Sequence, residues 1–268
     1  MTYLNRLAKK IILAFFASAI VWACSAPQKQ TEEVAEEAPA PKPITLTKAP
    51  ASPEYADASL SLNSMNVEAG DSSFTASFDF AVGNYELGAQ TEGADTRGIA
   101  NSGKGQHIHF IVNNGPYSAH YEPTFTKEME EGQYVLLAFL SRSYHESVKN
   151  ADAFWIDVVT VGEPAEVADI DLTAPHLFYS RPKGTYKGGD TEKLMVDFYL
   201  LNTTISPDGN KVKATINGTE FMIDEWAPYY AENLPKGEIT VKLELLDAEG
   251  QLIPGPFNSV ERKVTLAE

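Results

Sequence analysis

Cysteine and positive charge are both scarce in this sequence. Its 268 residues include one cysteine, Cys24, and 21 Lys plus Arg residues against 37 Asp plus Glu residues. A single cysteine cannot form an internal disulfide, so any folded domain must be stabilised by its own core. The acidic balance favours solubility and repels phosphate groups, so we expect neither nucleic-acid binding nor electrostatic attachment to anionic lipid.

Signatures of catalysis are also missing. The sequence contains no Gly-x-Ser-x-Gly elbow, no phosphate-cradling glycine loop and no His-Glu-x-x-His motif. It contains no convincing amphipathic helix of ordinary length either. We therefore predict that the protein is not an enzyme and acts by binding or interaction.

The N-terminus has the pattern of a secretory signal peptide. Three basic residues precede an apolar run from Ile11 to Ala23, which is too short for a comfortable transmembrane helix. The run ends directly before Cys24, and this arrangement resembles the bacterial lipoprotein signal, whose cysteine is lipidated after cleavage. We predict a signal peptide over residues 1–23 and an outer-membrane lipoprotein of the bacterial cell envelope, attached to the membrane through the lipid alone. The alternative is ordinary cleavage nearby with an incidental cysteine.

Residues 24–53 are rich in Pro, Ala and Glu, have few large apolar side chains and show no usable periodicity. This composition is typical of a disordered linker. We expect it to join the lipid to the folded part of the chain.

The rest of the chain predicts an all-β fold. Short strand-like runs alternate with turn residues, and this spacing is typical of β-sandwiches. Sequence landmarks of the first half recur in the second, so we predict two tandem immunoglobulin-like sandwiches over residues 54–165 and 172–268. The first matched segments are residues 80–84 and 198–202, and the next are residues 112–117 and 216–221. Between these two matches the first unit is 14 residues longer, and the additional residues fall in a glycine-rich loop.

The segment from Gln106 to Glu122 holds three of the five histidines and reads as a β-hairpin. The repeat assigns its faces. In the second unit Val212, Ala214 and Ile216 alternate with polar residues, so they point inward. Transferred to the first unit, this choice turns Ile108, Phe110 and Val112 inward, and His107 and His109 outward.

The outward histidines are candidate metal ligands. A four-residue turn would place His109 opposite His120 and His107 opposite Glu122, close enough to share an ion. His145, in a later loop, is a candidate fourth imidazole. This set favours zinc or copper. Two alternatives stay open: an exposed face that happens to carry imidazoles, and a face that seats the second domain, since three apolar residues that share it need cover. Those residues are Val135, Leu137 and Phe139.

A second candidate site binds anions. Ser141, Arg142 and Ser143 lie in a loop after an expected strand, and Arg181 with Lys183 forms a shorter echo of that pattern. Guanidinium and hydroxyl groups suit phosphate or a phosphopeptide. The alternative, which we favour, is a capping loop whose arginine pairs with a nearby acid.

The run from Gly105 to Asn113 resembles a set of uncharacterised secreted bacterial domains with a histidine-rich strand. The whole chain after Cys24 resembles two-domain envelope lipoproteins that are often labelled phosphopeptide-binding. The resemblance implies two β-sandwiches, an envelope location and a phosphopeptide ligand. Together these observations predict a binding or interaction module, for a protein or peptide ligand, that uses the outer face and end loops of domain one. Metal binding and phosphate binding are the alternative functions.

Overall fold

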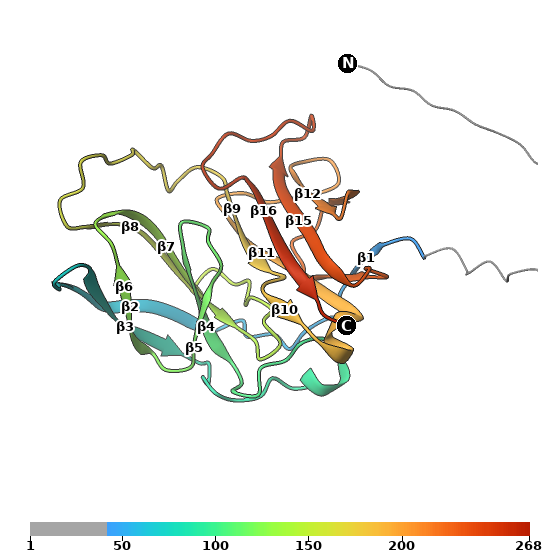
Figure 1. Cartoon of the computed structure of the whole chain (residues 1–268), viewed down its shortest axis with the longest axis horizontal. Helices are drawn as coiled ribbons and strands as arrows, with labels where there is room; N and C mark the ends of the chain where they lie inside the picture. The colour runs from blue at the N-terminus through green and yellow to red at the C-terminus, as the bar shows by residue number, and fades with distance from the viewer. Residues whose placement is uncertain (1–41) are drawn as a thin grey trace, which may run out of the picture. The chain divides into compact units, whose positions relative to one another are not determined.

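The computed structural model describes residues 42–268, so the predicted signal peptide and the predicted lipidation site at Cys24 lie outside it. The described chain is all-β and forms two tandem β-sandwiches, as the sequence predicts. Figure 1 shows the strands of the first sandwich grouped to the left of those of the second. Within residues 42–268, no helix has the length and apolar character that crossing a membrane requires.

The first sandwich consists of one three-stranded sheet, β2-β3-β6, and one four-stranded sheet, β5-β4-β7-β8. The strands of the two sheets are β2 Ser59–Ala69, β3 Phe74–Gly83, β6 Thr124–Met129, β5 Ser118–His120, β4 His107–Val112, β7 Gly132–Ser141 and β8 Phe154–Val161. The predicted glycine-rich loop connects β3 to β4 and contains a short 3-10 helix, η1, at Ala94–Thr96.

The second sandwich pairs a four-stranded sheet, β1-β14-β11-β9, with a five-stranded sheet, β10-β16-β15-β12-β13. The strands of the first are β1 Thr45–Lys48, β14 Tyr229–Glu232, β11 Lys193–Leu201 and β9 His176–Arg181. Those of the second are β10 Thr185–Tyr186, β16 Ser259–Leu266, β15 Gly237–Leu246, β12 Lys211–Ile216 and β13 Thr219–Ile223, and a 3-10 helix, η2, spans Gly188–Thr191.

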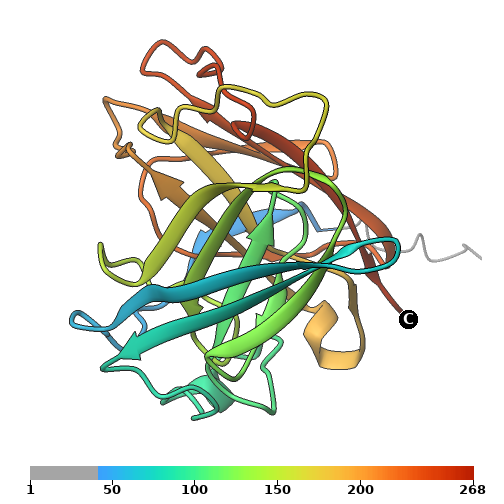
Figure 2. The same cartoon turned by 90° about the vertical axis from the view of Figure 1, so that its left-hand side faces the viewer.

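The four sheets stack in layers with three large apolar clusters between them, and a fourth, smaller cluster includes Tyr144 and Tyr230. One cluster fills each sandwich, around Phe110 in the first and Phe198 in the second. The third lies between the sheets β5-β4-β7-β8 and β1-β14-β11-β9, an interface that we call the seam. There the Phe139 ring stacks on Tyr199 with centroids 4.8 Å apart. In Figure 2 the blue and teal strands β2 and β3 lie in front of the strands of the next sheet.

Burial follows the layer order. In the inner sheets, β9 is buried at every residue and β11 at all but its first. In the outer sheet of the second sandwich, β12 alternates between half-buried and buried residues. A strand covered on both faces reads as a continuous apolar run, whereas a strand covered on one face alternates. Strand β4 is buried at every residue but its last, so both of its faces are covered.

Hydrogen bonds and an ion pair also connect the two sandwiches across the seam. The side-chain amide of Asn114, at the tip of the β4–β5 hairpin, donates to the carbonyls of Leu177 and Phe257, and its oxygen accepts from the Tyr179 N–H. Farther along, Lys149 of the first sandwich pairs with the fully buried Asp197 of the second at 2.5 Å. A buried charge needs such a partner, so the seam is built as interior and not as a loose contact.

The predicted linker is wrong at its C-terminal end. Residues 45–48 form β1, which pairs antiparallel with β14 of the second sandwich. The Ala49 N–H then donates to the Pro228 carbonyl at 2.9 Å. The residues before β1 therefore lead into the second sandwich, and the chain afterwards crosses to build the first.

The inward side predicted for β4 is confirmed. Ile108 and Phe110 lie in the cluster of the first sandwich together with Leu136 and Leu140, and Val112 packs at its margin. Tyr117 lies in the cluster of the seam.

Candidate metal centre at the seam

Three histidines meet at one end of the seam, and we call His107, His109 and His145 the histidine cluster. Strand β4 turns the first two toward the second sandwich, and the loop after β7 brings the third. The Nε2 atoms of His107 and His109 are 2.9 Å apart, and His145 Nδ1 lies 3.2 Å from His107 Nε2. One nitrogen from each ring lies within 4.8 Å of the other two.

The protonation of the His107 ring follows from its neighbours. Its Nδ1 lies 2.8 Å from the Gly105 carbonyl oxygen, which can only accept a hydrogen bond. Nδ1 therefore carries the hydrogen, and Nε2 of the neutral ring points a lone pair into the cluster. His109 Nδ1 lies 3.3 Å from the Ser180 hydroxyl, which can donate or accept and so supports either tautomer.

His145 reaches the cluster through an uncommon backbone conformation. Its φ is +71°, in the left-handed region, and its N–H donates to the Arg142 carbonyl at 2.8 Å. Residues other than glycine adopt this region at a conformational cost, which the surrounding structure must offset. Here the tight loop turns the imidazole toward His107.

Burial keeps all three rings neutral. It lowers the pKa of His107 to about 4 and that of His145 to about 2, with smaller contributions from the Arg181 and Lys183 charges. The pKa of His109 falls well below its usual value, because the ring is fully buried. At neutral pH the cluster offers imidazoles in the form that binds metals.

The second sandwich supplies positive charge beside the histidine cluster. Arg181 Nη1 donates to the Tyr117 hydroxyl at 3.0 Å, and Lys183 Nζ donates to the Tyr117 carbonyl at 2.5 Å. The Tyr117 ring stacks on His109 with centroids 3.5 Å apart, and its hydroxyl lies 3.3 Å from His145 Nδ1. Burial raises the pKa of Tyr117, and the charge of Arg181 acts against that increase.

The structure excludes His120 and Glu122 from the histidine cluster. The prediction pairs His109 with His120, but His109 lies opposite Ala119, and His120 lies opposite Ile108. The reason is the turn. Pro116 has no N–H to contribute to the ladder, and the hairpin register shifts by one residue. His120 therefore stacks on Phe125 on the opposite side of the sheet, while Glu122 is exposed.

The predicted anion loop also proves structural. Arg142 is buried, pairs with Glu146 at 3.2 Å and donates to the carbonyls of Ser147 and Pro53. Ser143 exchanges hydrogen bonds with Thr91. Arg142 therefore pairs with a nearby acid, as the capping alternative predicts, and only its Nε is buried without a hydrogen-bond partner. Ser141, likewise buried, donates to the Arg142 carbonyl.

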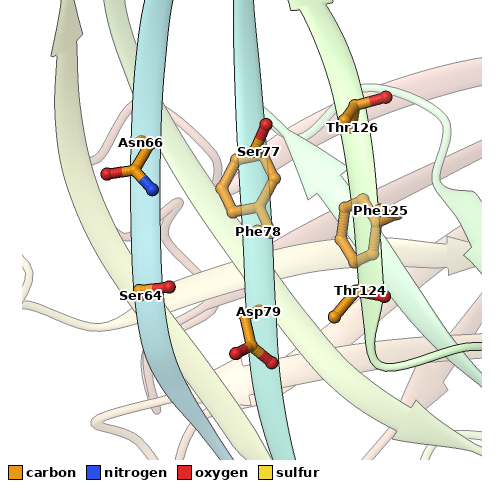
Figure 3. Close-up of a pocket in the computed structure, with 8 residues that line it drawn as sticks. All are labelled: Ser64, Asn66, Ser77, Phe78, Asp79, Thr124, Phe125 and Thr126. Carbon is orange, nitrogen blue, oxygen red and sulfur yellow. The ribbon is translucent and has the colours of Figure 1, made fainter.

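The outer face that we predicted as a binding surface is divided. Sheet β5-β4-β7-β8 is covered by the second sandwich, so the seating alternative is confirmed for its histidines. The sheet β2-β3-β6 carries a hollow of about 480 Å³ (Figure 3). Its rim bears hydroxyl, amide and carboxylate groups from Ser64, Asn66, Ser77, Asp79, Thr124 and Thr126. No residue of this hollow belongs to the histidine cluster.

Comparisons with known proteins found similarities to solved structures, all at low identity and low TM-score. No protein-family model matches the sequence, and no curated protein matches it. The fibronectin(III)-like modules of Clostridium thermocellum CbhA share 13% identity over 78% of this chain and 94% of theirs, with a TM-score of 0.27. A two-domain fibronectin type III segment of chicken tenascin shares 10% identity over 76% of this chain and 98% of that one, with a TM-score of 0.20.

A third similar structure is Bacteroides ovatus SGBP-B of a mixed-linkage glucan utilization locus, in complex with a mixed-linkage heptasaccharide. It shares 11% identity over 84% of this chain and 71% of that one, with a TM-score of 0.21. None of these comparisons supports the resemblance to phosphopeptide-binding lipoproteins. The fold and the site define a tandem β-sandwich protein with a histidine cluster at its seam.

Proposed function

We propose that this protein is a non-enzymatic metal-binding protein that holds one divalent transition-metal ion, copper(II) in preference to zinc, through the histidine cluster. The observation that carries the proposal is the spacing of three neutral imidazole nitrogens, two of whose separations are 2.9 and 3.2 Å. Two nitrogens bound at about 2.0 Å to one ion lie about 2.9 Å apart at a right angle and about 3.3 Å apart in a tetrahedron.

The donor set favours copper. The histidine cluster contains three imidazoles and no thiolate or carboxylate. Imidazole binds both copper and zinc, and for a given site copper(II) binds more tightly. Bound histidines commonly donate their second N–H to a carbonyl, as His107 does to Gly105.

Tyr121 lies beside the histidine cluster and also lines a surface hollow. A hollow of about 640 Å³ opens over β5 and is lined by residues that include His120 and Tyr121. The Tyr121 ring centroid lies 5.0 Å from that of His107.

Metal titration tests the proposal. The full chain carrying Cys24→Ser, which removes the only thiol, is titrated with copper(II) and zinc(II) in competition with a chelator. We expect one ion per chain, and a loss of more than about 100-fold in affinity for His107→Gln and for His145→Gln, because losing even a ligand's hydrogen-bond partner costs 10- to 100-fold.

His120→Gln is the matched control, since His120 neighbours the cluster in sequence and lies outside it. It should bind as the parent does. Absence of binding, or equal binding by His107→Gln in a variant whose thermal unfolding is unchanged, would leave the histidines with a purely structural role at the seam.

We also propose that the protein acts in the bacterial cell envelope, anchored through Cys24. The support is the basic and apolar N-terminal pattern that ends at this cysteine. Cys24→Ser should release the protein from membranes. If the variant still sediments with membranes after a high-salt wash, the anchor assignment is wrong.

A further inference from the structure

Three positively charged side chains at the seam have no acidic partner within the described residues. Arg181 is buried, Arg262 and Lys183 are half-buried, and within residues 42–268 no salt bridge includes any of the three. The Nε of Arg181 and one Nη of Arg262 are buried without a hydrogen-bond partner. A divalent ion bound only by neutral imidazoles would add two further positive charges here, at a high cost in a low-dielectric site.

One hydroxyl group that can lose a proton, that of Tyr117, lies beside these charges and also contacts the histidine cluster. The Tyr117 hydroxyl accepts from Arg181 Nη1 at 3.0 Å and lies 3.3 Å from His145 Nδ1. Together with the cluster spacings of 2.9 and 3.2 Å, this gives a continuous series of four donor atoms, each at the separation of neighbouring ligands on one ion.

We propose that Tyr117 is the fourth ligand and binds the metal through its phenolate oxygen, with Arg181 as the hydrogen-bond donor that stabilises the negative oxygen. The inference rests on the proposed metal-binding function. On binding, copper(II) gives up coordinated water, the Tyr117 O–H bond breaks, and the proton passes to solvent. The metal keeps its oxidation state. The phenolate supplies negative charge beside Arg181, Lys183 and Arg262, which form no salt bridge within residues 42–268.

The fixed position of Tyr117 suits this role. Its ring is stacked between His109 and the Lys183 ammonium, which lies 4.2 Å from the ring centroid. Its backbone carbonyl is held by the same lysine. A ligand that is already oriented loses little conformational freedom on binding, so the site needs no rearrangement of the hairpin.

The test uses the colour of the copper complex. A phenolate bound to copper(II) gives a visible charge-transfer absorption that imidazole ligands alone do not give. In the full chain carrying Cys24→Ser, we expect this band on adding copper(II), and its loss in Tyr117→Phe. That variant keeps the stacked ring and should still bind copper, with an affinity at least about tenfold lower.

Tyr121→Phe is the matched control, because Tyr121 lies beside His107 while its hydroxyl is held by Ser102 at 2.7 Å. It should keep the band. A colourless complex that binds equally tightly in the parent and in Tyr117→Phe overturns the tyrosine ligand and leaves the histidine site standing. Absence of copper binding in the parent overturns both proposals.

Discussion

The β4–β5 hairpin of the first sandwich and the β12–β13 hairpin of the second occupy equivalent places but face different surroundings. Where β4 has His107 and His109, β12 has Lys211 and Lys213. Lys213 reaches Glu244 at 3.0 Å on a partly exposed face, whereas both histidines are fully buried by the second sandwich. Alignment with the second unit therefore predicts which side of a strand in the first unit points into its own core, but it does not predict what covers the opposite side.

The hairpin tips show the same difference. Asn114 and its counterpart Gly218 both adopt positive φ, at +52° and +85°. Glycine meets that requirement without strain, and Asn is among the few other residues that tolerate it. In the first sandwich the Asn114 side chain also binds three backbone groups of the seam, a task that the exposed tip of the second sandwich does not have.

The largest expected effect is the pH dependence of stability that the buried histidines impose. The unfolded chain protonates each histidine below about pH 6.5, whereas folded His107 stays neutral to about 4 and folded His145 to about 2. Acid therefore favours unfolding, and this stability is complete above pH 6.5 and lost as the pH falls. Between pH 6.5 and 5 each of the three histidines should cost up to about 2 kcal/mol of unfolding free energy.

Urea unfolding at pH 5.0, 6.5 and 8.0 measures this loss. The variant His107→Gln plus His145→Gln should lose up to about 4 kcal/mol less than the parent over the acidic interval, because two of the titrating groups are gone. The hydrogen bond to Glu244 raises the pKa of Lys213, at the equivalent face of the second sandwich, so this residue stays charged over the whole interval. Equal slopes for parent and variant would show that these imidazoles are accessible to protons.

The second expectation concerns a variant that gives the two hairpin tips the same residue. Asn114→Gly copies the residue at position 218 and keeps the backbone unstrained, but it leaves two carbonyls and one N–H without their partner. Each such group costs about 1–3 kcal/mol, so we expect a loss of about 3–9 kcal/mol in urea unfolding. Asn217→Gly, at an exposed turn residue with φ of +48°, should change stability by a few tenths of a kcal/mol. Similar effects for the two variants would mean that the Asn114 bonds contribute nothing net.

The third expectation concerns the pH dependence of metal affinity. Ordinary histidine metal sites lose affinity below about pH 6.5, because protonated imidazole cannot bind a metal. Because burial has already lowered the pKa values of the cluster, we expect no additional loss near pH 6.5. Release of one proton from Tyr117 should instead give a uniform tenfold fall per pH unit between pH 8 and 5, and Tyr117→Phe should flatten it. Chelator competition across that range distinguishes the slopes, and a break at pH 6.5 would contradict the neutral cluster.

The smallest expected effect comes from the solvent-facing side of the second hairpin. Lys213→Ala removes ion pairs with Glu220 and Glu244, at 3.7 and 3.0 Å, on a partly exposed surface. Such pairs contribute about 0–1 kcal/mol, so unfolding in urea should change by less than that, and less still in high salt. A loss above about 2 kcal/mol would show that this face is covered as the seam is.

Most of the first sandwich could be predicted from local pattern and the repeat. The alternation of β12 fixed the inward side of β4, and Ile108 and Phe110 lie where that argument puts them. The place of His145 followed from its loop. The His120 pairing failed because one residue of turn length reverses the side on which every following residue lies, and Pro116 alters the count.

Long-range features had weaker signals. The sequence sign of the seam is the outward apolar face of Val135, Leu137 and Phe139, which needs cover, and all three residues lie in the cluster of the seam. Tyr117 as a cluster neighbour follows only from the corrected register. The pairing of β1 with β14 has no local signal at all, because its partner is distant in the chain and its own composition reads as a linker.

Strand β1 makes the second sandwich a discontinuous domain, into which the first is inserted. Lys48 and Glu225, which form an ion pair beside the β1–β14 ladder, are 177 residues apart in sequence. Closing so long a flexible loop costs entropy, but a folded first sandwich shortens the effective loop and holds β1 near its partner. A chain nicked between residues 162 and 175 would accordingly yield an N-terminal fragment that holds the whole first sandwich together with β1, and a C-terminal fragment whose sheet needs β1, so the pair should stay assembled without a peptide bond between them.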